Sequence, residues 1–208
     1  MKTKNRLPGL PAVSSPSEEL ILVDSNDCVL GHASKLRAHA GDGMLHRAFS
    51  VFLFDSRQRL LLHRRSALKP LWPGYWTNSC CSHPRRGEQL TASVNRRLWE
   101  ELGCEAARLQ RLCAFEYHAR YADIGSEHEL CHVFVALLNE RSSVAAHPQE
   151  ISEMTWVDCD EVDAMMREQR PDLTPWFRKE WALLRGPRKL AFDRFLNAIP
   201  DTGAVVSP

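Results

Sequence analysis

Two adjacent cysteines and a histidine form the first group of residues with the potential for chemistry. Cys80, Cys81 and His83 lie in the run Trp-Thr-Asn-Ser-Cys-Cys-Ser-His-Pro, residues 76–84. Side chains in a strand alternate between its two faces, so Cys81 and His83 are expected to share one face and Cys80 to occupy the other. A thiol and an imidazole on one face can act as an acid/base pair or bind a metal. The alternative is a pair of inert core cysteines, a common fate of free thiols.

Histidines and glutamates elsewhere in the chain supply further candidate metal ligands. His39 and His46 flank a Gly-rich stretch, and Glu127 and Glu129 form a Glu-x-Glu pair. On one face of a strand, two such carboxylates lie close together and need a cation or a proton between them. Together with His83, these nitrogen and oxygen donors suit Mn, Zn, Fe or Mg. Taken singly, each residue is better explained as an ordinary polar position or a solvated strand edge.

Basic residues are candidates for binding an anion. The candidates Lys35, Arg64-Arg65, Lys69 and Arg96-Arg97 are scattered along the sequence, and exposure to solvent is the usual explanation of such residues. Arg97 and Glu101 are one helical turn apart, which is compatible with a simple salt bridge on the helix surface. The functional interpretation is a diphosphate held by these cations, with a metal bridging it to Glu101.

The hydrophobic pattern predicts the elements that carry these residues. Leu90, Val94, Leu98 and Leu102 recur every fourth residue and predict one apolar helix stripe over residues 88–102, which ends at Gly103. The order of elements predicts an α/β (α+β) sandwich around a mixed sheet. The expected strands are 19–23, 48–54 with a hairpin partner at 59–64, 109–121, 127–138 and 153–158, and the further helices are 160–167, a segment within 171–186, and 189–197.

The chain has 208 residues and a net charge of only +1, so no global field attracts it to nucleic acid or to a membrane surface. No apolar run approaches the roughly 20 residues that cross a bilayer, and no apolar segment of a secretory signal follows the basic start. Seven irregularly spaced cysteines favour a reducing compartment, which predicts the cytoplasm. We expect a Pro- and Ser-rich flexible arm at 1–18, one domain at 19–199 and a tail at 200–208.

The segment from Gly87 to Gly103 resembles a degenerate Nudix box, which in the hydrolases runs Gly-x5-Glu-x7-Arg-Glu-x2-Glu-Glu-x-Gly. Two positions depart from that pattern: Ser82 replaces the leading glycine, and Arg97 replaces the first glutamate after the arginine. In the hydrolases that glutamate helps to hold the catalytic metal. Arg97 therefore disfavours hydrolysis and favours diphosphate binding. The matching positions are Glu88, Arg96, Glu100, Glu101 and Gly103.

Combined with the Thr-Asn-Ser-x-Cys-x-His-Pro stretch, the Glu-x-Glu strand and the Trp-Pro-Gly-x-Trp turn, this box resembles the type I isopentenyl-diphosphate isomerases over about Leu20 to Trp181. The resemblance implies a Nudix-like mixed β-sheet sandwiched between helices. It also implies interconversion of isopentenyl diphosphate and dimethylallyl diphosphate by addition of one proton and removal of another. The substrate is then a small prenyl diphosphate, and the protein is expected to be a monomer or a homodimer.

The same resemblance assigns roles to individual residues. Cys81 and Glu129 would face opposite sides of the allyl unit, with Tyr117 assisting Glu129. The implied first metal is Mn²⁺, Zn²⁺ or Mg²⁺, and Glu101 would bind a second ion, Mg²⁺, on the diphosphate. The implied ligands of the first metal are His39, His46, His83, Glu127 and Glu129, and the implied substrate-binding residues are Lys35, Arg65, Lys69, Arg97 and Trp181.

Two other functions remain compatible with these residues. One is a Nudix hydrolase of a diphosphate-containing substrate, against which Arg97 is the main evidence. The other is a non-catalytic interaction protein stabilised by a metal. Under that second alternative, replacing Cys81 would change stability, and no prenyl diphosphate would be turned over.

Overall fold

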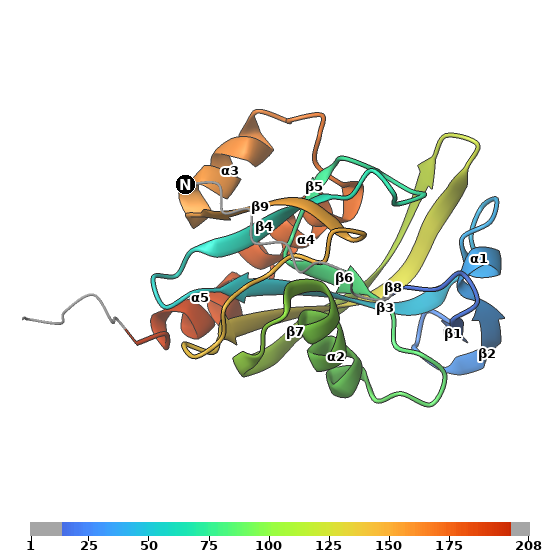
Figure 1. Cartoon of the computed structure of the whole chain (residues 1–208), viewed down its shortest axis with the longest axis horizontal. Helices are drawn as coiled ribbons and strands as arrows, with labels where there is room; N and C mark the ends of the chain where they lie inside the picture. Colours follow the sequence, from blue (N-terminus) through green and yellow to red (C-terminus); the bar gives the residue numbers. More distant parts are fainter. Residues whose placement is uncertain (1–13, 201–208) are drawn as a thin grey trace, which may run out of the picture.

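A long apolar strand, β3 (His46–Phe54), lies at the centre of a nine-stranded sheet. The computed structural model describes residues 14–200, so most of the predicted arm (1–18) and tail (200–208) lies outside the described residues. The other strands are β1 (Glu19–Val23), β2 (Val29–Ser34), β4 (Leu60–Arg65), β5 (Trp76–Thr77), β6 (Cys80–Ser82), β7 (Ala106–Tyr121), β8 (Gly125–Leu138) and β9 (Ile151–Val157). The helices are α1 (Lys35–Ala38), α2 (Leu90–Leu102), α3 (Cys159–Arg167), α4 (Pro175–Arg185) and α5 (Lys189–Asn197) (Figure 1).

Both edges of β3 are occupied by strands distant in sequence. β6 pairs antiparallel with β3, and β8 pairs parallel with it from His46↔Glu129 to Phe54↔Leu137. A strand can pair along only two edges, and β6 and β8 already occupy both edges of β3. β4 therefore pairs with β3 only at Phe54↔Leu60. The predicted hairpin between 48–54 and 59–64 is therefore wrong beyond its turn. β4 instead diverges to pair with β5 and β9.

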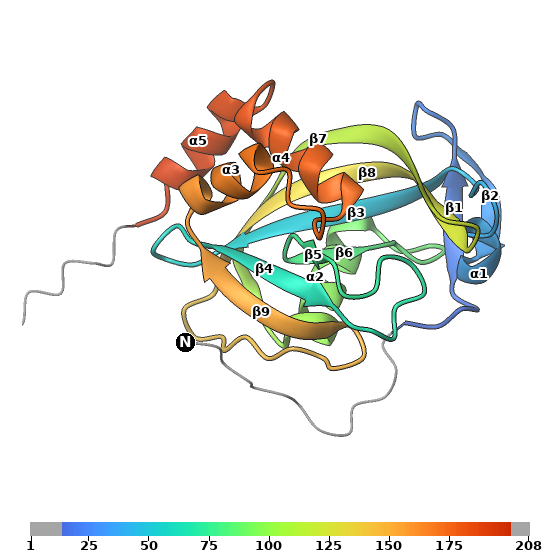
Figure 2. The ribbon, with the colours of Figure 1, turned by 90° about the horizontal axis from the view of Figure 1, so that it is seen from above.

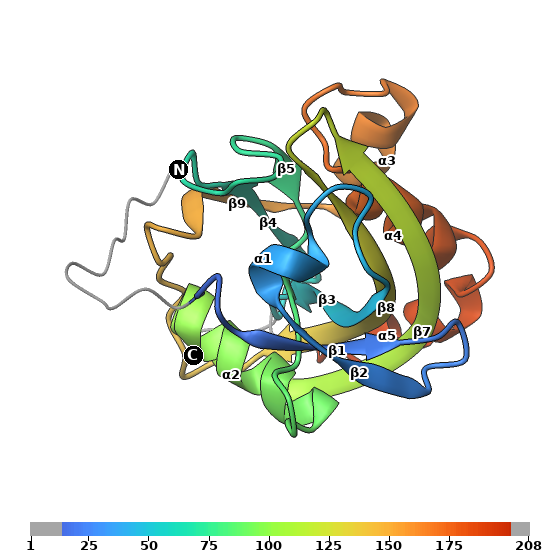
Figure 3. The same ribbon diagram turned by 90° about the vertical axis from the view of Figure 1, so that its right-hand side faces the viewer.

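Helices cover both faces of the sheet, which confirms the predicted sandwich. α3, α4 and α5 lie on one side and α2 lies on the other (Figure 2). Successive residues of β3 pack alternately into the hydrophobic cores on the two faces of the sheet. Phe52 and Phe54 belong to the core under α4 and α5, whereas Val51 and Leu53 belong to the core under α2. β1, β2 and α1 lie together at one end of the sheet (Figure 3).

The predicted apolar stripe of α2 is confirmed. Val94, Leu98 and Leu102 are fully buried, and Gly103 ends the helix with a left-handed φ of 60°, which glycine adopts without steric cost. The expected surface position of Arg97 and Glu101 is wrong, because their exposed fractions are only 2% and 3%. Both side chains are covered where α2 faces Glu150, which precedes β9.

Smaller differences concern where elements begin. α1 was not predicted, because its four residues are too few to show a helical period. α4 begins at Pro175, and proline is favoured at the first position of a helix. The helix predicted at 189–197 is confirmed with the same bounds.

Among residues 14–200, no helix is long and apolar enough to cross a membrane.

The buried stripe of α2 generates a stability prediction. Leu98→Ala should lower the free energy of unfolding by about 2–5 kcal/mol, because it removes a fully buried side chain and leaves a cavity. Urea unfolding followed by circular dichroism measures this. The matched control is Leu190→Ala, whose leucine is 68% exposed and whose cost should stay within about 0.5 kcal/mol. Equal losses in the two variants would contradict the assignment of the core.

Candidate active site

Five metal-ligating side chains converge at the end of the sheet near α1. One ligand atom from each of them can be chosen so that all lie within 4.8 Å of one another. They come from the end of α1, the start of β3, the residue after β6 and one face of β8, so segments far apart in sequence meet here. The parallel register His46↔Glu129 aligns two of them directly across neighbouring strands. The five residues are His39, His46, His83, Glu127 and Glu129.

The electrostatics of this cluster suit a divalent cation. His39 Nε2 lies 2.9 Å from Glu127 Oε2, and His83 Nε2 lies 2.8 Å from Glu129 Oε1. Burial lowers the pKa of His46 to about 3, which keeps its imidazole in the neutral form that binds metals. Burial and the neighbouring Glu127 carboxylate raise the pKa of Glu129. His46 Nε2 has no hydrogen-bond partner among the described residues, as expected of a ligand nitrogen facing an ion position.

Glu129 also has a partner on the adjacent strand. Tyr117 lies directly opposite Glu129 in the β7–β8 ladder, and its hydroxyl donates a hydrogen bond of 2.7 Å to Glu129 Oε2. One carboxylate oxygen thus contacts His83 and the other contacts Tyr117. This fixes the orientation of the carboxyl group before any substrate binds.

Cys81 and His83 line the same cavity, as the alternation of strand side chains predicts. Cys80 points the other way into the core under α2, where its thiol lies 3.5 Å from Glu101 Oε1. The Cys81 thiol donates to Asn78 Oδ1 at 2.9 Å and lies 3.3 Å from Ser50 Oγ. Burial raises the pKa of Cys81, so the protonated thiol is its resting form.

The cavity has a volume of about 460 Å³ and combines two kinds of lining. The lining includes the charged groups Lys35, Lys69 and Glu150, which lie near one another, and also Cys81 and the neighbouring rings of Tyr117 and Trp176. Such a combination suits a ligand with an anionic head and a short apolar tail. Glu127, Glu129 and His83 also line the cavity, so the metal cluster borders the same space.

The cations at the cavity have defined partners. The Arg65 guanidinium donates to the carbonyls of Leu71 and Trp72 and lies 5.2 Å from the ring centroid of Trp176. Lys69 Nζ lies 2.5 Å from Glu150 Oε2. Lys35 donates to Ser14 Oγ at 2.6 Å, which brings the first described residue to the cavity.

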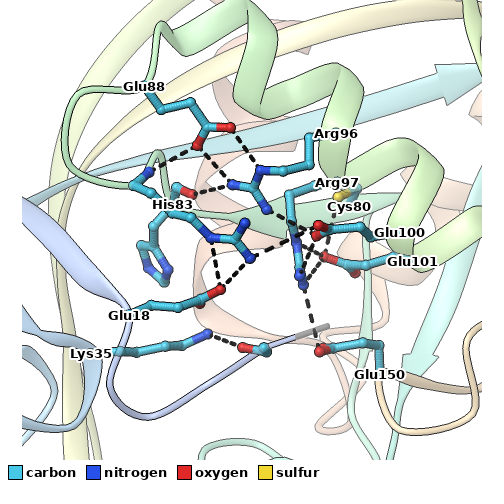
Figure 4. Close-up of polar contacts among 12 residues, drawn as sticks. Glu18, Lys35, Cys80, His83, Glu88, Arg96, Arg97, Glu100, Glu101 and Glu150 are labelled. Atoms are coloured by element: carbon cyan, nitrogen blue, oxygen red, sulfur yellow. Dashed lines mark hydrogen bonds and ion pairs between the residues drawn. The ribbon is translucent and has the colours of Figure 1, made fainter. Parts of the chain in front are cut away.

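Arg97 is the centre of a buried network of carboxylates behind this cavity (Figure 4). Its Nη2 lies 2.5 Å from Glu101 Oε1 and 3.5 Å from Glu150 Oε1, and its Nη1 lies 3.1 Å from Glu100 Oε2. Arg97 and Glu101 are not among the residues that line the cavity, whereas Glu150 is. Sequence reasoning missed Glu150, because no motif marks it in the irregular stretch before β9.

Trp181 does not line the cavity, contrary to its expected contact with substrate. Its indole donates to Asp163 Oδ1 at 2.7 Å and stacks on Phe52 in the core under α4 and α5. Trp176 is the indole that reaches the cavity, and its Nε1 donates to Thr77 Oγ1 at 3.0 Å. The signal in the sequence was Pro175, which places Trp176 in the first turn of α4, at the helix end near the site.

Comparison with known proteins gives one consistent family. The NUDIX domain family matches residues 44–177. Isopentenyl-diphosphate Delta-isomerase 1 of Photorhabdus laumondii is 41% identical over 79% of this chain and 93% of its own length. An isopentenyl-diphosphate Delta-isomerase of Serratia proteamaculans is 42% identical over 77% of this chain and 87% of its own. A solved structure from Deinococcus radiodurans covers 81% of this chain and 98% of its own, with 22% identity and a TM-score of 0.62, and shows the fold alone.

The cluster generates a metal-binding prediction with a matched control. His46→Ala should weaken Mn²⁺ binding by at least about 10- to 100-fold, since the loss of even an outer-shell partner costs this much. Calorimetric titration of metal-stripped protein measures the change. His63→Ala is the control, because His63 is also buried with a pKa lowered to about 3 but lies outside the cluster. Equal weakening in both variants would show that general damage, rather than loss of a ligand, explains the result.

Proposed function

The chain belongs to the isopentenyl-diphosphate Delta-isomerases of the NUDIX domain family, and we propose that its site interconverts isopentenyl diphosphate and dimethylallyl diphosphate in isoprenoid biosynthesis. The observation that carries this proposal is the convergence of Cys81 and Glu129 on one cavity. They come from β6 and β8, the strands on the two edges of β3. Two proton-exchanging groups on separate strands suit a reaction that adds a proton at one carbon and removes one from another.

The charged part of the cavity is proposed to bind the diphosphate. Lys35, Arg65 and Lys69 supply its positive charge, and Arg97 adds a buried guanidinium behind Glu150. In the unliganded site, Lys69 and Arg97 share the Glu150 carboxylate. A diphosphate oxygen would take the place of that carboxylate on Lys69. Binding would therefore exchange one anionic partner for another, without leaving a buried cation unpaired.

The prenyl group is proposed to lie between Cys81 and Glu129. Protonation of the terminal alkene carbon breaks the π bond and leaves a tertiary carbocation, and removal of a proton from C2 forms the new double bond. An alkene is a poor base, so the donor must be pre-aligned and shielded from water. Hydrogen bonds from Tyr117 and His83 orient Glu129, and Asn78 and Ser50 orient Cys81. Because the reaction runs both ways, each group both gives and takes a proton.

Two divalent ions are proposed as cofactors. His39, His46, His83, Glu127 and Glu129 would hold Mn²⁺, Zn²⁺ or Mg²⁺, whose charge would alter the acidity of Glu129 and fix its orientation. Glu101 would hold Mg²⁺ on the diphosphate, which requires its side chain to turn from Arg97 toward the cavity that it does not line in the unliganded site. Glu101 already lies beside Arg97 in the buried network, next to the charged part of the cavity.

Trp176 replaces Trp181 in our assignment of the aromatic residue at the prenyl group. Its indole lines the cavity and is held by Thr77. An aromatic face stabilises a cation by about 0.5–2 kcal/mol and offers no nucleophile that would capture it. Tyr117 lies near this indole, with ring centroids 6.3 Å apart.

A cytoplasmic location and a monomeric or homodimeric state remain predictions.

The proposed activity is tested by incubating the protein with isopentenyl diphosphate and Mg²⁺ and following the mixture by proton NMR for the alkene and phosphorus NMR for released phosphate. The expected result is dimethylallyl diphosphate without free phosphate or pyrophosphate. Cys81→Ala should stay folded and lose at least about 100-fold in kcat, since general acid–base groups contribute about 10²–10⁴-fold. Release of phosphate would instead identify a hydrolase. A folded protein that turns over nothing would favour the interaction protein.

Lys35 generates a prediction of pH dependence. Burial and the nearby Lys69 and Arg97 cations lower its pKa to about 8, so its charge is present below pH 8 and lost above it. The value of kcat/KM, which reports the free enzyme, should therefore fall as the pH rises through about 8. Lys35→Arg should move this fall to higher pH, because arginine stays charged up to about pH 12. An unchanged profile in Lys35→Arg would assign the fall to another group.

A further inference from the structure

A buried carboxyl group lies behind the cavity in a place that the proposed reaction does not use. Glu180, on the face of α4 turned toward the sheet, is fully buried at 0% exposure. Its Oε1 accepts a hydrogen bond from the Cys131 thiol at 3.4 Å, and its Oε2 has no hydrogen-bond partner in the part of the chain that the structure describes. Glu180 does not line the cavity. Burying a carboxyl group this way is costly, so its presence calls for an explanation.

Glu180 is connected to the cavity by a line of short polar side chains. The Cys131 thiol that contacts Glu180 is also 3.5 Å from Ser50 Oγ, and Ser50 Oγ is 3.3 Å from Cys81 Sγ. Ser50 lies on β3 directly opposite Cys81 on β6. The line therefore runs from α4 through β8 and β3 to the thiol that faces the prenyl group.

The direction of these hydrogen bonds depends on Glu180. A serine hydroxyl has one proton to donate and can accept from other groups. The Cys131 thiol lies within hydrogen-bond distance of both Ser50 and Glu180, so its proton can go to either of them. When Cys131 donates to Ser50, the Ser50 proton remains available to Cys81, whose own proton is directed to Asn78. Burial raises the pKa of Glu180 to about 7, which permits a neutral carboxyl group in this place.

We propose that Glu180 is a positioning residue for the isomerisation, which fixes Ser50 and Cys131 and through them the orientation of the Cys81 thiol. This inference rests on the proposed function, because it concerns the orientation of the Cys81 thiol relative to the proposed substrate. The alignment matters because a reacting group displaced by about 1 Å can cost about 100-fold in rate. Diphosphate binding involves other residues, so the effect should appear in kcat and not in KM.

The test compares steady-state kinetics of three variants with the wild type. Glu180→Leu removes the polar contact and should lower kcat by about 10- to 100-fold with KM unchanged. Glu180→Gln keeps an oxygen that accepts from Cys131 and should retain kcat within about threefold of the wild type, because Gln is nearly isosteric. Leu184→Ala is the matched control, since Leu184 is equally buried one turn further along the same face of α4 and should keep kcat.

A double-mutant cycle with Ser50→Ala identifies the route of the effect. If Glu180 acts through Ser50, Ser50→Ala should lower kcat as Glu180→Leu does, and the double variant should be no slower than either single one. Multiplicative losses in the double variant would overturn the route through Ser50. Wild-type kcat in folded Glu180→Leu, or the same loss in Leu184→Ala, would overturn the positioning role.

These results are separable from a failure of the proposed function. An inactive wild-type protein would contradict the isomerase assignment itself. An active wild type whose Glu180→Leu variant is equally active would contradict only the role of Glu180. Circular dichroism and the urea midpoint of each variant show that the compared proteins are folded.

Discussion

The site depends on the burial of two carboxylates side by side. Glu127 and Glu129 lie on one face of β8 and line the cavity, and each is less than one-tenth exposed. Two such charges require compensation, which three imidazoles from other segments and a divalent ion would supply. The Tyr117 hydroxyl bonds the remaining Glu129 oxygen. The carboxyl group proposed to exchange protons with the substrate is therefore held by the same contacts that make its burial tolerable.

The order of the strands places the two groups proposed to exchange protons around one cavity. β3 has β6 on one edge and β8 on the other, so Cys81 and Glu129 approach the cavity from different strands. The polar groups behind Cys81 extend from Ser50 to Glu180 on α4. Apolar packing of α4 against the sheet thus bears on the orientation of the thiol. The cationic side chains Lys35 and Lys69 come from other segments, which would separate recognition of the diphosphate from proton exchange.

The features predictable from the sequence are those with a local period. The alternation of side chains placed Cys81 and His83 together and paired Glu127 with Glu129, because a strand fixes these relations within three residues. The stripe of α2 followed from its four-residue spacing in the same way. The long-range convergence of His39 and His46 on this group was inferred through family resemblance, since no local pattern relates them to β8.

The features that sequence missed depend on packing between elements. The sequence predicts a surface position for Arg97, because its i, i+4 spacing with Glu101 does not reveal that Arg97 also pairs with Glu150, far along the chain. Trp176 and Trp181 lie on one helix, and only the docking of α4 decides which indole meets the cavity. The hairpin after β3 was over-predicted, because β8, far along the chain, occupies an edge of β3. The preference of each residue for helix or strand contains no information on how these elements pack together.

The central claim is that two fixed groups exchange protons with one bound prenyl unit. The most direct measurement follows conversion of two isopentenyl diphosphate samples, each with deuterium in one of the two stereochemically distinct positions at C2. The account predicts that one sample loses its deuterium and the other keeps it, because a base fixed on one side of the allyl unit reaches only one face. Equal loss from both samples would contradict a fixed base and, with it, the role assigned to the buried carboxylates.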